Sequence, residues 1–209
     1  MVWIIIKGGP LMIPILAGSV IGFAIVVEKI WSLWTIKLDV PKFAEVIFSR
    51  LRSGQTDLAL KFCAENLKHP ISKIFKIGIE RRDLPVAEIE KTLERLGMFQ
   101  VNDLEKYLGG LISIIGIEPL LGFLGTITGL IKAFMAWEQA GSDITVSALA
   151  QGIYQAMITT AAGLSVAVPL YLLCNYIISR IKHTAKELSN YSMELVEVIA
   201  EMKRGKTKA

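Results

Sequence analysis

The feature that most constrains this chain is a run of 36 residues, 144–179, without a single charged side chain. Residues 11–27 form a second uncharged run, and residues 111–131 form a third that contains only Glu118. A bilayer core of about 30 Å is crossed by roughly 20 apolar residues in a helix, because only a helix satisfies its own backbone there. The sequence therefore predicts an all-α membrane protein with three transmembrane helices. As one helix, the longest run would extend about 54 Å, beyond the hydrocarbon.

The first apolar stretch resembles a signal peptide, because it is preceded by one basic residue, Lys7. No small-x-small cleavage site follows where it ends, at "VVEKIWSLW", so we interpret it as a retained span. Cys63 falls in a polar region and Cys174 inside a span. That placement favours two reduced, structural thiols over a disulfide.

The distribution of lysine and arginine predicts the orientation. Residues 35–108 carry thirteen of them and the tail after Ser179 carries seven, whereas the link "EQAGSDITVSA" carries none. The positive-inside rule then places the N-terminus and the link outside and the rest in the cytoplasm. The net charge of +4 follows from this topology, so nucleic-acid binding is not needed to explain it.

The predicted divisions follow from the spans and the orientation. They are a periplasmic N-terminus (1–10), transmembrane helix 1 (11–34), a cytoplasmic helical region (35–108), transmembrane helix 2 (109–137), a short periplasmic link (138–147), transmembrane helix 3 (148–179) and a cytoplasmic helical tail (180–209). We expect a multi-pass protein of the cell inner membrane, with the N-terminus in the periplasm and the C-terminus in the cytoplasm.

The cytoplasmic segments show helical periodicity. Their predicted apolar faces are Phe43, Val46, Ile47 and Leu51; Val86, Ile89, Leu93 and Leu96; and Ile181, Leu188, Leu195, Val198 and Met202. The segment that begins near Leu84 is expected to continue without a break into the second span. The segments are too short to hide these faces alone, so we expect them to lengthen the spans and pack against neighbouring subunits.

Two stripes of small and polar residues occupy the inner spans. Glu118, Gly122, Gly125, Thr126 and Gly129 share one helical face of the second span, and Gly152, Gln155, Thr159, Thr160 and Gly163 share one face of the third. Such stripes let two helices approach closely, and threonines can bond to their own helix. The alternative is a polar pathway, which Glu118 favours most: a charge at mid-membrane costs about 2.5–3.5 kcal/mol and usually marks an ion path or a partner.

Other site chemistry finds little support in the sequence. His69 and His183 are interpreted as surface residues, because no second type of metal ligand lies at a suitable spacing. No phosphate-binding loop, nucleophile elbow or catalytic triad is present. We expect neither an enzyme, nor a metal site, nor an organic cofactor.

Two motifs carry a family resemblance: "PLLGFLGTITGLIKAF" (119–134) and "GIYQAMITTAAGLSVAVPLYLLCNY" (152–176). With "VEKIWSLW" and "HPISKIFKIGIE", they resemble the three-span ExbB/TolQ branch of the MotA/TolQ/ExbB proton-channel family. The resemblance implies a homopentamer whose second and third spans line a central pore around two copies of a single-span ExbD/TolR-like partner. That partner carries an essential aspartate, and a TonB- or TolA-like protein receives the work. Thr126 and Thr160 match threonines that face the pore in the family.

The chain departs from the family at two positions: Gln155 stands where many members have glutamate, and Glu118 where a small residue is common. The two spans are antiparallel, so residues at equal depth have numbers that sum to about 287. Thr126 is then level with Thr160 or Ala161, Gln155 with Lys132, and Glu118 with Pro169. Glu118 and Gln155 lie about 20 Å apart along the pore, so Glu118 does not replace the missing acid.

The functional hypothesis is a stator or channel subunit that uses the proton motive force to drive an envelope process, such as TonB-dependent import or Tol-type envelope maintenance. Its predicted ion-path residues are Glu118, Thr126, Gln155, Thr159 and Thr160. Sodium is an alternative ion, because pairs of threonines supply oxygens. A non-conducting pentameric scaffold for an envelope protein is the alternative function. The process driven, the ion, the stoichiometry and the place of Glu118 on or off the path stay open at this point.

Overall fold

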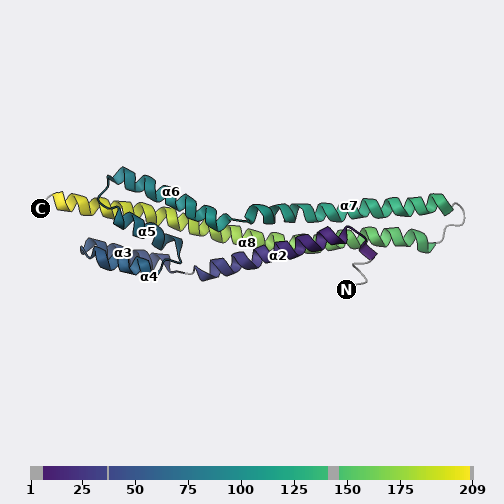
Figure 1. Ribbon diagram of the computed structural model, residues 1–209, viewed down its shortest axis with the longest axis horizontal. Helices are drawn as coiled ribbons and strands as arrows, with labels where there is room; N and C mark the ends of the chain where they lie inside the picture. The colour runs from purple at the N-terminus through teal and green to yellow at the C-terminus, as the bar shows by residue number, and fades with distance from the viewer. Residues whose placement is uncertain (1–6, 37, 141–145, 208–209) are drawn as a thin grey trace. The chain divides into compact units, whose positions relative to one another are not determined.

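The computed structural model describes residues 7–36, 38–140 and 146–207, and every regular element in these ranges is a helix (Figure 1). Three described segments are long and apolar enough to cross a membrane; they lie within Met12–Arg52, Val86–Gln139 and Ala150–Arg204. The prediction of an all-α protein with three membrane-spanning helices is confirmed. Parts of the predicted N-terminus (1–6), link (141–145) and tail (208–209) lie outside the described residues.

The helices are α2 (Met12–Thr35), α3 (Val40–Arg52), α4 (Thr56–Glu65), α5 (Pro70–Glu80), α6 (Val86–Glu105), α7 (Leu108–Ala140) and α8 (Val146–Thr207). They form two compact units, each described here by itself. One unit contains Met1–Glu28 and Tyr107–Tyr176, and the other Lys29–Lys106 and Ile177–Ala209. In the first unit, α7 runs antiparallel beside the first half of α8 (Figure 1).

The second unit has a hydrophobic core of its own. Its buried residues come from α3, α4, α5, α6 and the last part of α8, and include Phe43, Ile47, Leu51, Ile71, Ile74, Phe75, Ile79, Ile89, Leu93, Leu188, Leu195 and Val198. The predicted apolar faces are therefore largely correct. The expectation that these faces need neighbouring subunits is wrong, because the four short helices cover one another and the α8 tail.

The predicted continuous helix from the cytoplasm into the second span is also interrupted. Helix α6 ends at Glu105, and Lys106 takes an extended conformation. Tyr107 follows with a φ of 69°, which a residue with a bulky side chain rarely adopts. Helix α7 begins one residue later. The hydrophobic periodicity on both sides did not predict this break, because the break lies in the backbone angles of Lys106 and Tyr107 and leaves the apolar pattern unchanged.

His69 is not the surface residue that the sequence suggested. Only 6% of its area is exposed, and its Nδ1 accepts a hydrogen bond from the backbone N–H of Ile71, 3.1 Å away, which caps α5. Desolvation by burial lowers the pKa of His69 to about 4. The neutral ring is thus the form that caps the helix, since Nδ1 accepts only when it carries no proton.

This cap should make the stability of the second unit depend on pH. The folded form takes up the His69 proton only near pH 4, whereas an exposed histidine does so near 6.5. Stability is therefore complete above about pH 6.5 and falls, by no more than a few kcal/mol, as the pH drops towards 4. Hydrogen exchange of the α5 amides in the full chain, corrected for intrinsic rates, measures the effect. His69→Asn keeps a capping acceptor without titrating; equal pH dependence in this variant would contradict the assignment.

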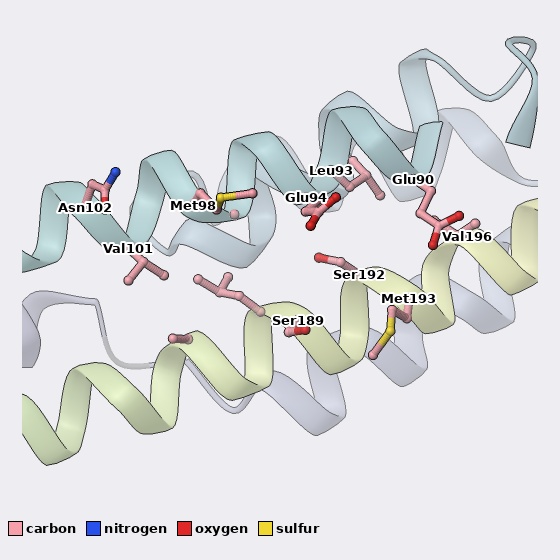
Figure 2. Close-up of a pocket in the computed structure, with 13 residues that line it drawn as sticks. Glu90, Leu93, Glu94, Met98, Val101, Asn102, Ser189, Ser192, Met193 and Val196 are labelled. Atoms are coloured by element: carbon pink, nitrogen blue, oxygen red, sulfur yellow. The ribbon is translucent and has the colours of Figure 1, made fainter. Parts of the chain in front are cut away.

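A groove of about 590 Å³ lies between α6 and the α8 tail in the second unit. Figure 2 shows Met98 and Val101 of α6 and Met193 of α8 around it, with Glu94 and Ser192 pointing into the space between the two helices. Its lining is mainly apolar. The sequence patterns predicted the two helices but not a groove between them.

Candidate functional site

Helices α7 and α8 are in backbone contact along a line of glycines, here called the α7–α8 seam (Gly122, Gly125, Gly129, Gly152 and Gly163). A methyl group added at Gly129 would lie 2.7 Å from the carbonyl oxygen of Gly152, and one added at Gly152 would lie 2.9 Å from the backbone nitrogen of Ala133. At Gly163 it would lie 2.5 Å from the carbonyl oxygen of Glu118. Side chains are excluded at these positions, so the two helices can approach as small-residue seams allow.

A pair of threonine hydroxyls, Thr126 of α7 and Thr160 of α8, bridges this seam. Their Oγ1 atoms are 2.6 Å apart. The carbonyl oxygen of Gly122 lies 2.9 Å from Thr160 Oγ1 and 3.3 Å from Thr126 Oγ1. Each hydroxyl has one proton and both lone pairs, so the three oxygens allow two arrangements of bonds. In either one, one threonine donates to Gly122 and the other donates to its partner threonine.

Thr159, the neighbour of Thr160, is placed differently. It is completely buried and its hydroxyl donates within its own helix, 3.0 Å from the carbonyl oxygens of both Gln155 and Ala156. It fills the space opposite Gly125, where an added Cβ would overlap its side chain. Thr159 thus packs inside the seam, with its hydroxyl bonded within α8.

Gln155 has a basic neighbour. Its Oε1 accepts a hydrogen bond from Lys132 Nζ of α7, 3.2 Å away. Its side-chain amide also packs against Gly9, where an added Cβ would lie 2.5 Å from Nε2. An amide both accepts from and donates to neighbours without carrying charge. The structure thus gives this position a neutral group beside an ammonium, in place of the glutamate that the family resemblance led us to look for.

Glu118 lies against the first span. It is 1% exposed, and its Oε1 occupies the space that a side chain at Gly18 of α2 would need. Its Oε2 has no hydrogen-bond partner in the described part of the chain. Glu118 is therefore buried within one chain, with its carboxyl group against Gly18 of α2 and its backbone against Gly163 of α8.

The predicted ion-path residues fall on two sides of the seam. Successive helix positions are about 100° apart, so Thr126 lies about 80° around α7 from Glu118 and about 120° from Lys132. On α8, Thr160 lies about 140° from Gln155. The side that carries Glu118, Lys132 and Gln155 contacts α2 and the residues before it. The structure brings Thr126 and Thr160 together but does not join them to the other predicted ion-path residues, which are Glu118, Gln155 and Thr159.

Two residues of this region were not among the sequence candidates. Lys132 ends the uncharged run of the second span, and the sequence analysis noted it only as the residue level with Gln155. Gly18 was not singled out, although it forms with Gly22 a small-xxx-small pair, a known signal for close helix contact. Gly18 meets the α7 side chains of Glu118 and Ile114, and Gly22 meets Leu170 of α8 and Ile114 of α7.

The described residues contain no group of three histidine, cysteine or acidic side chains that could hold a metal ion. Cys63 and Cys174 are both free and buried.

Comparisons with known proteins identify the family. A model of the MotA/TolQ/ExbB proton channel family matches residues 66–190, more than half of the chain. A biopolymer transport protein ExbB homolog of Methanothermobacter thermautotrophicus is 31% identical over 206 residues, covering 93% of this chain and 71% of that protein. The Tol-Pal system protein TolQ of Haemophilus influenzae is 25% identical, covering 90% of this chain and 86% of its own. The biopolymer transport protein ExbB of Salmonella typhimurium is 25% identical, covering 91% and 78%. With three membrane-spanning helices and these relatives, the chain belongs to the ExbB/TolQ branch of the MotA/TolQ/ExbB proton channel family.

Proposed function

We propose that this chain is the channel-forming subunit of an inner-membrane complex that uses the proton motive force to drive an envelope process. The relatives named ExbB and TolQ belong to biopolymer transport and to the Tol-Pal system, so the process proposed is TonB-dependent import or Tol-type envelope maintenance. The complex proposed is a pentamer of this chain with a single-span ExbD/TolR-like partner, and with a TonB- or TolA-like protein to receive the work.

The observation that supports a conducting role is the threonine pair, Thr126 and Thr160. Two hydroxyls and the Gly122 carbonyl form a short chain of hydrogen bonds between two spans. Its two bond arrangements differ only in which hydroxyl donates to the carbonyl. Protons move along chains of groups that both give and accept, so the pair is suited to form part of a proton path. Thr126 and Thr160 are thus the proposed path residues of this chain.

The remaining predicted path residues have a weaker claim. Thr159 donates its hydroxyl to its own helix, and Gln155 is bonded to Lys132. Glu118 is enclosed against α2. We assign these three to the contacts within one subunit and keep the threonine pair for the path.

Reconstitution tests the proposal. The chain is purified with its single-span partner and placed in liposomes, and proton and sodium fluxes are measured separately under an imposed gradient. Proton flux that requires the partner is the expected result. Sodium flux of equal size would favour the alternative ion.

A non-conducting scaffold is the second candidate function. The observation in its favour is Gln155, a neutral amide bonded to Lys132 where many relatives have an acid. Absence of proton and sodium flux from a complex whose partner is present and whose gradient is verified would overturn the channel and favour the scaffold.

A further inference from the structure

Glu118 is the one acid among the apolar residues of the second span, and its environment is set by the first span. Gly18 of α2 lies so close that an added Cβ would overlap Glu118 Oε1, and the same Cβ would lie 3.7 Å from Ile114. On the α8 side, Gly163 contacts the backbone carbonyl of Glu118. The residue is 1% exposed. Its carboxyl group lies against Gly18 of α2, and its backbone lies against Gly163 of α8.

The charged groups of α2 and α7 are distant from this carboxyl. On α2 the first is Glu28, ten residues beyond Gly18 and so about 15 Å along the helix. Tyr107, just before α7, is eleven residues before Glu118, about 16 Å along the axis. On α7 itself, Lys132 is fourteen residues after Glu118, about 21 Å away, and Glu138 is further on.

The titratable groups of α8 in this unit are Tyr154, Tyr171, Cys174 and Tyr176. Tyr171 is only two residues from Pro169, which is level with Glu118, but Tyr171 is 56% exposed whereas Glu118 is 1% exposed. No cation or ionised donor from any of the three helices faces the carboxyl in the described part of the chain.

A carboxylate in this position would lack both water and a counter-charge. Burying an ionised group without partners costs far more than burying a neutral one, and in the bilayer the cost is several kcal/mol. The neutral acid avoids most of this cost. The surroundings therefore suit a carboxyl group that holds its proton.

We propose that Glu118 is a proton-binding site built into the contact between the first span and α7: with the proton bound, α2 packs on α7 through Gly18, and loss of the proton releases α2. The bound species is a single proton, and the step is its transfer from the Glu118 carboxyl to water or a buffer base. The inference does not rest on the proposed channel, because it concerns the packing of helices within one chain.

Infrared difference spectroscopy tests whether the proton is bound. The full chain is reconstituted in liposomes near neutral pH, and its spectrum is compared with that of Glu118→Gln, which has a similar shape and cannot ionise. The carbonyl-stretch band of a protonated carboxyl is expected in the wild type and should be lost in the variant. Absence of that band in the wild type would overturn the proposal.

A distance measurement tests the release. Spin labels are attached at Val20 of α2 and Leu120 of α7, two strongly exposed positions, in a chain without Cys63 and Cys174 and diluted with unlabelled chain. As the pH is raised and the carboxyl band disappears, the single narrow distance should be lost in the wild type and kept in Glu118→Gln. Band loss without any change in distance, equal behaviour of the two proteins, or a band that persists until the protein unfolds would each overturn the release.

A second pair of variants keeps the test informative if Glu118→Gln does not fold. Gly18→Ala places a methyl group on the carboxyl oxygen, so the narrow distance should be lost at every pH. Gly116→Ala, where nothing lies within 4 Å of the added Cβ, is the matched control and should behave as wild type. A narrow distance in Gly18→Ala would overturn the contact on which the proposal depends.

Discussion

Replacing either member of the threonine pair by valine should reduce partner-dependent proton flux to the background of protein-free liposomes while the complex still assembles. Valine has almost the shape of threonine, so the seam can close around it, but it has no hydroxyl. Thr160→Val removes the 2.6 Å bond to Thr126 and the 2.9 Å bond to Gly122. The expected loss of stability is only about 1 kcal/mol, the usual net value of a hydrogen bond.

Two further threonines in the same helices control this experiment. Thr128 of α7 donates to the carbonyl oxygen of Gly125 in its own helix, 3.0 Å away, so Thr128→Val should conduct as wild type does. Thr159→Val distinguishes the two roles considered for its hydroxyl: retained flux places Thr159 in the seam, and lost flux places it on the path. Flux that survives both Thr126→Val and Thr160→Val would contradict the assignment of the pair.

The sequence could predict which residues of the two facing helices lie at the same depth, because antiparallel helices rise by the same amount per residue. Counting from the centre of the link placed Thr126 beside Thr160 or Ala161 and Gln155 beside Lys132; the structure has hydrogen bonds between Thr126 and Thr160 and between Lys132 and Gln155. Glu118 was placed beside Pro169, yet its backbone contacts Gly163. Side chains tilt towards the N-terminus of their own helix. The two residue numbers of a pair joined by side chains therefore add up to a larger sum than those of a pair in backbone contact.

The sequence could not show which neighbour each side of the seam would have. A stripe of small and polar residues identifies the face that another helix can approach, but the first span and a pore can both meet such a face. Glu118 and Thr126 belong to one stripe, and the difference between them is about 80° of rotation around α7. That difference appears only when the position of Gly18 is known.

The sequence patterns also did not predict the helix break at Tyr107 or the burial of His69. The break at Tyr107 depends on one positive φ angle, which hydrophobic periodicity does not record. His69 was interpreted as a surface residue because no second metal ligand lies at a suitable spacing. In the structure it is buried and caps α5 through Nδ1, a role that several other residue types can take, so the sequence did not identify it.

Gly129→Ala should weaken the protein more than any other single methyl group added to α7. The added carbon would lie 2.7 Å from the carbonyl oxygen of Gly152 and 2.8 Å from the backbone nitrogen of Ala156. These are backbone atoms of α8, which cannot turn aside as a flexible side chain does, so the helices must separate. Forcing a group into a closely packed contact costs about 1–3 kcal/mol, and the seam would lose contacts on both sides of the site.

Gly116→Ala, thirteen positions earlier in the same helix, gives the matched comparison. Its added Cβ meets nothing within 4 Å, and alanine in a helix interior is favoured over glycine by about 0.5–1 kcal/mol. Thermal unfolding in detergent should therefore show a lower midpoint for Gly129→Ala and an equal or higher one for Gly116→Ala. Gly152→Ala tests the same contact from the other helix, and its effect should not add to that of Gly129→Ala, because residues in contact share one separation of the helices. Equal midpoints for Gly129→Ala and wild type would mean that α7 and α8 do not touch at this glycine, and the close approach that aligns Thr126 with Thr160 would lose its basis.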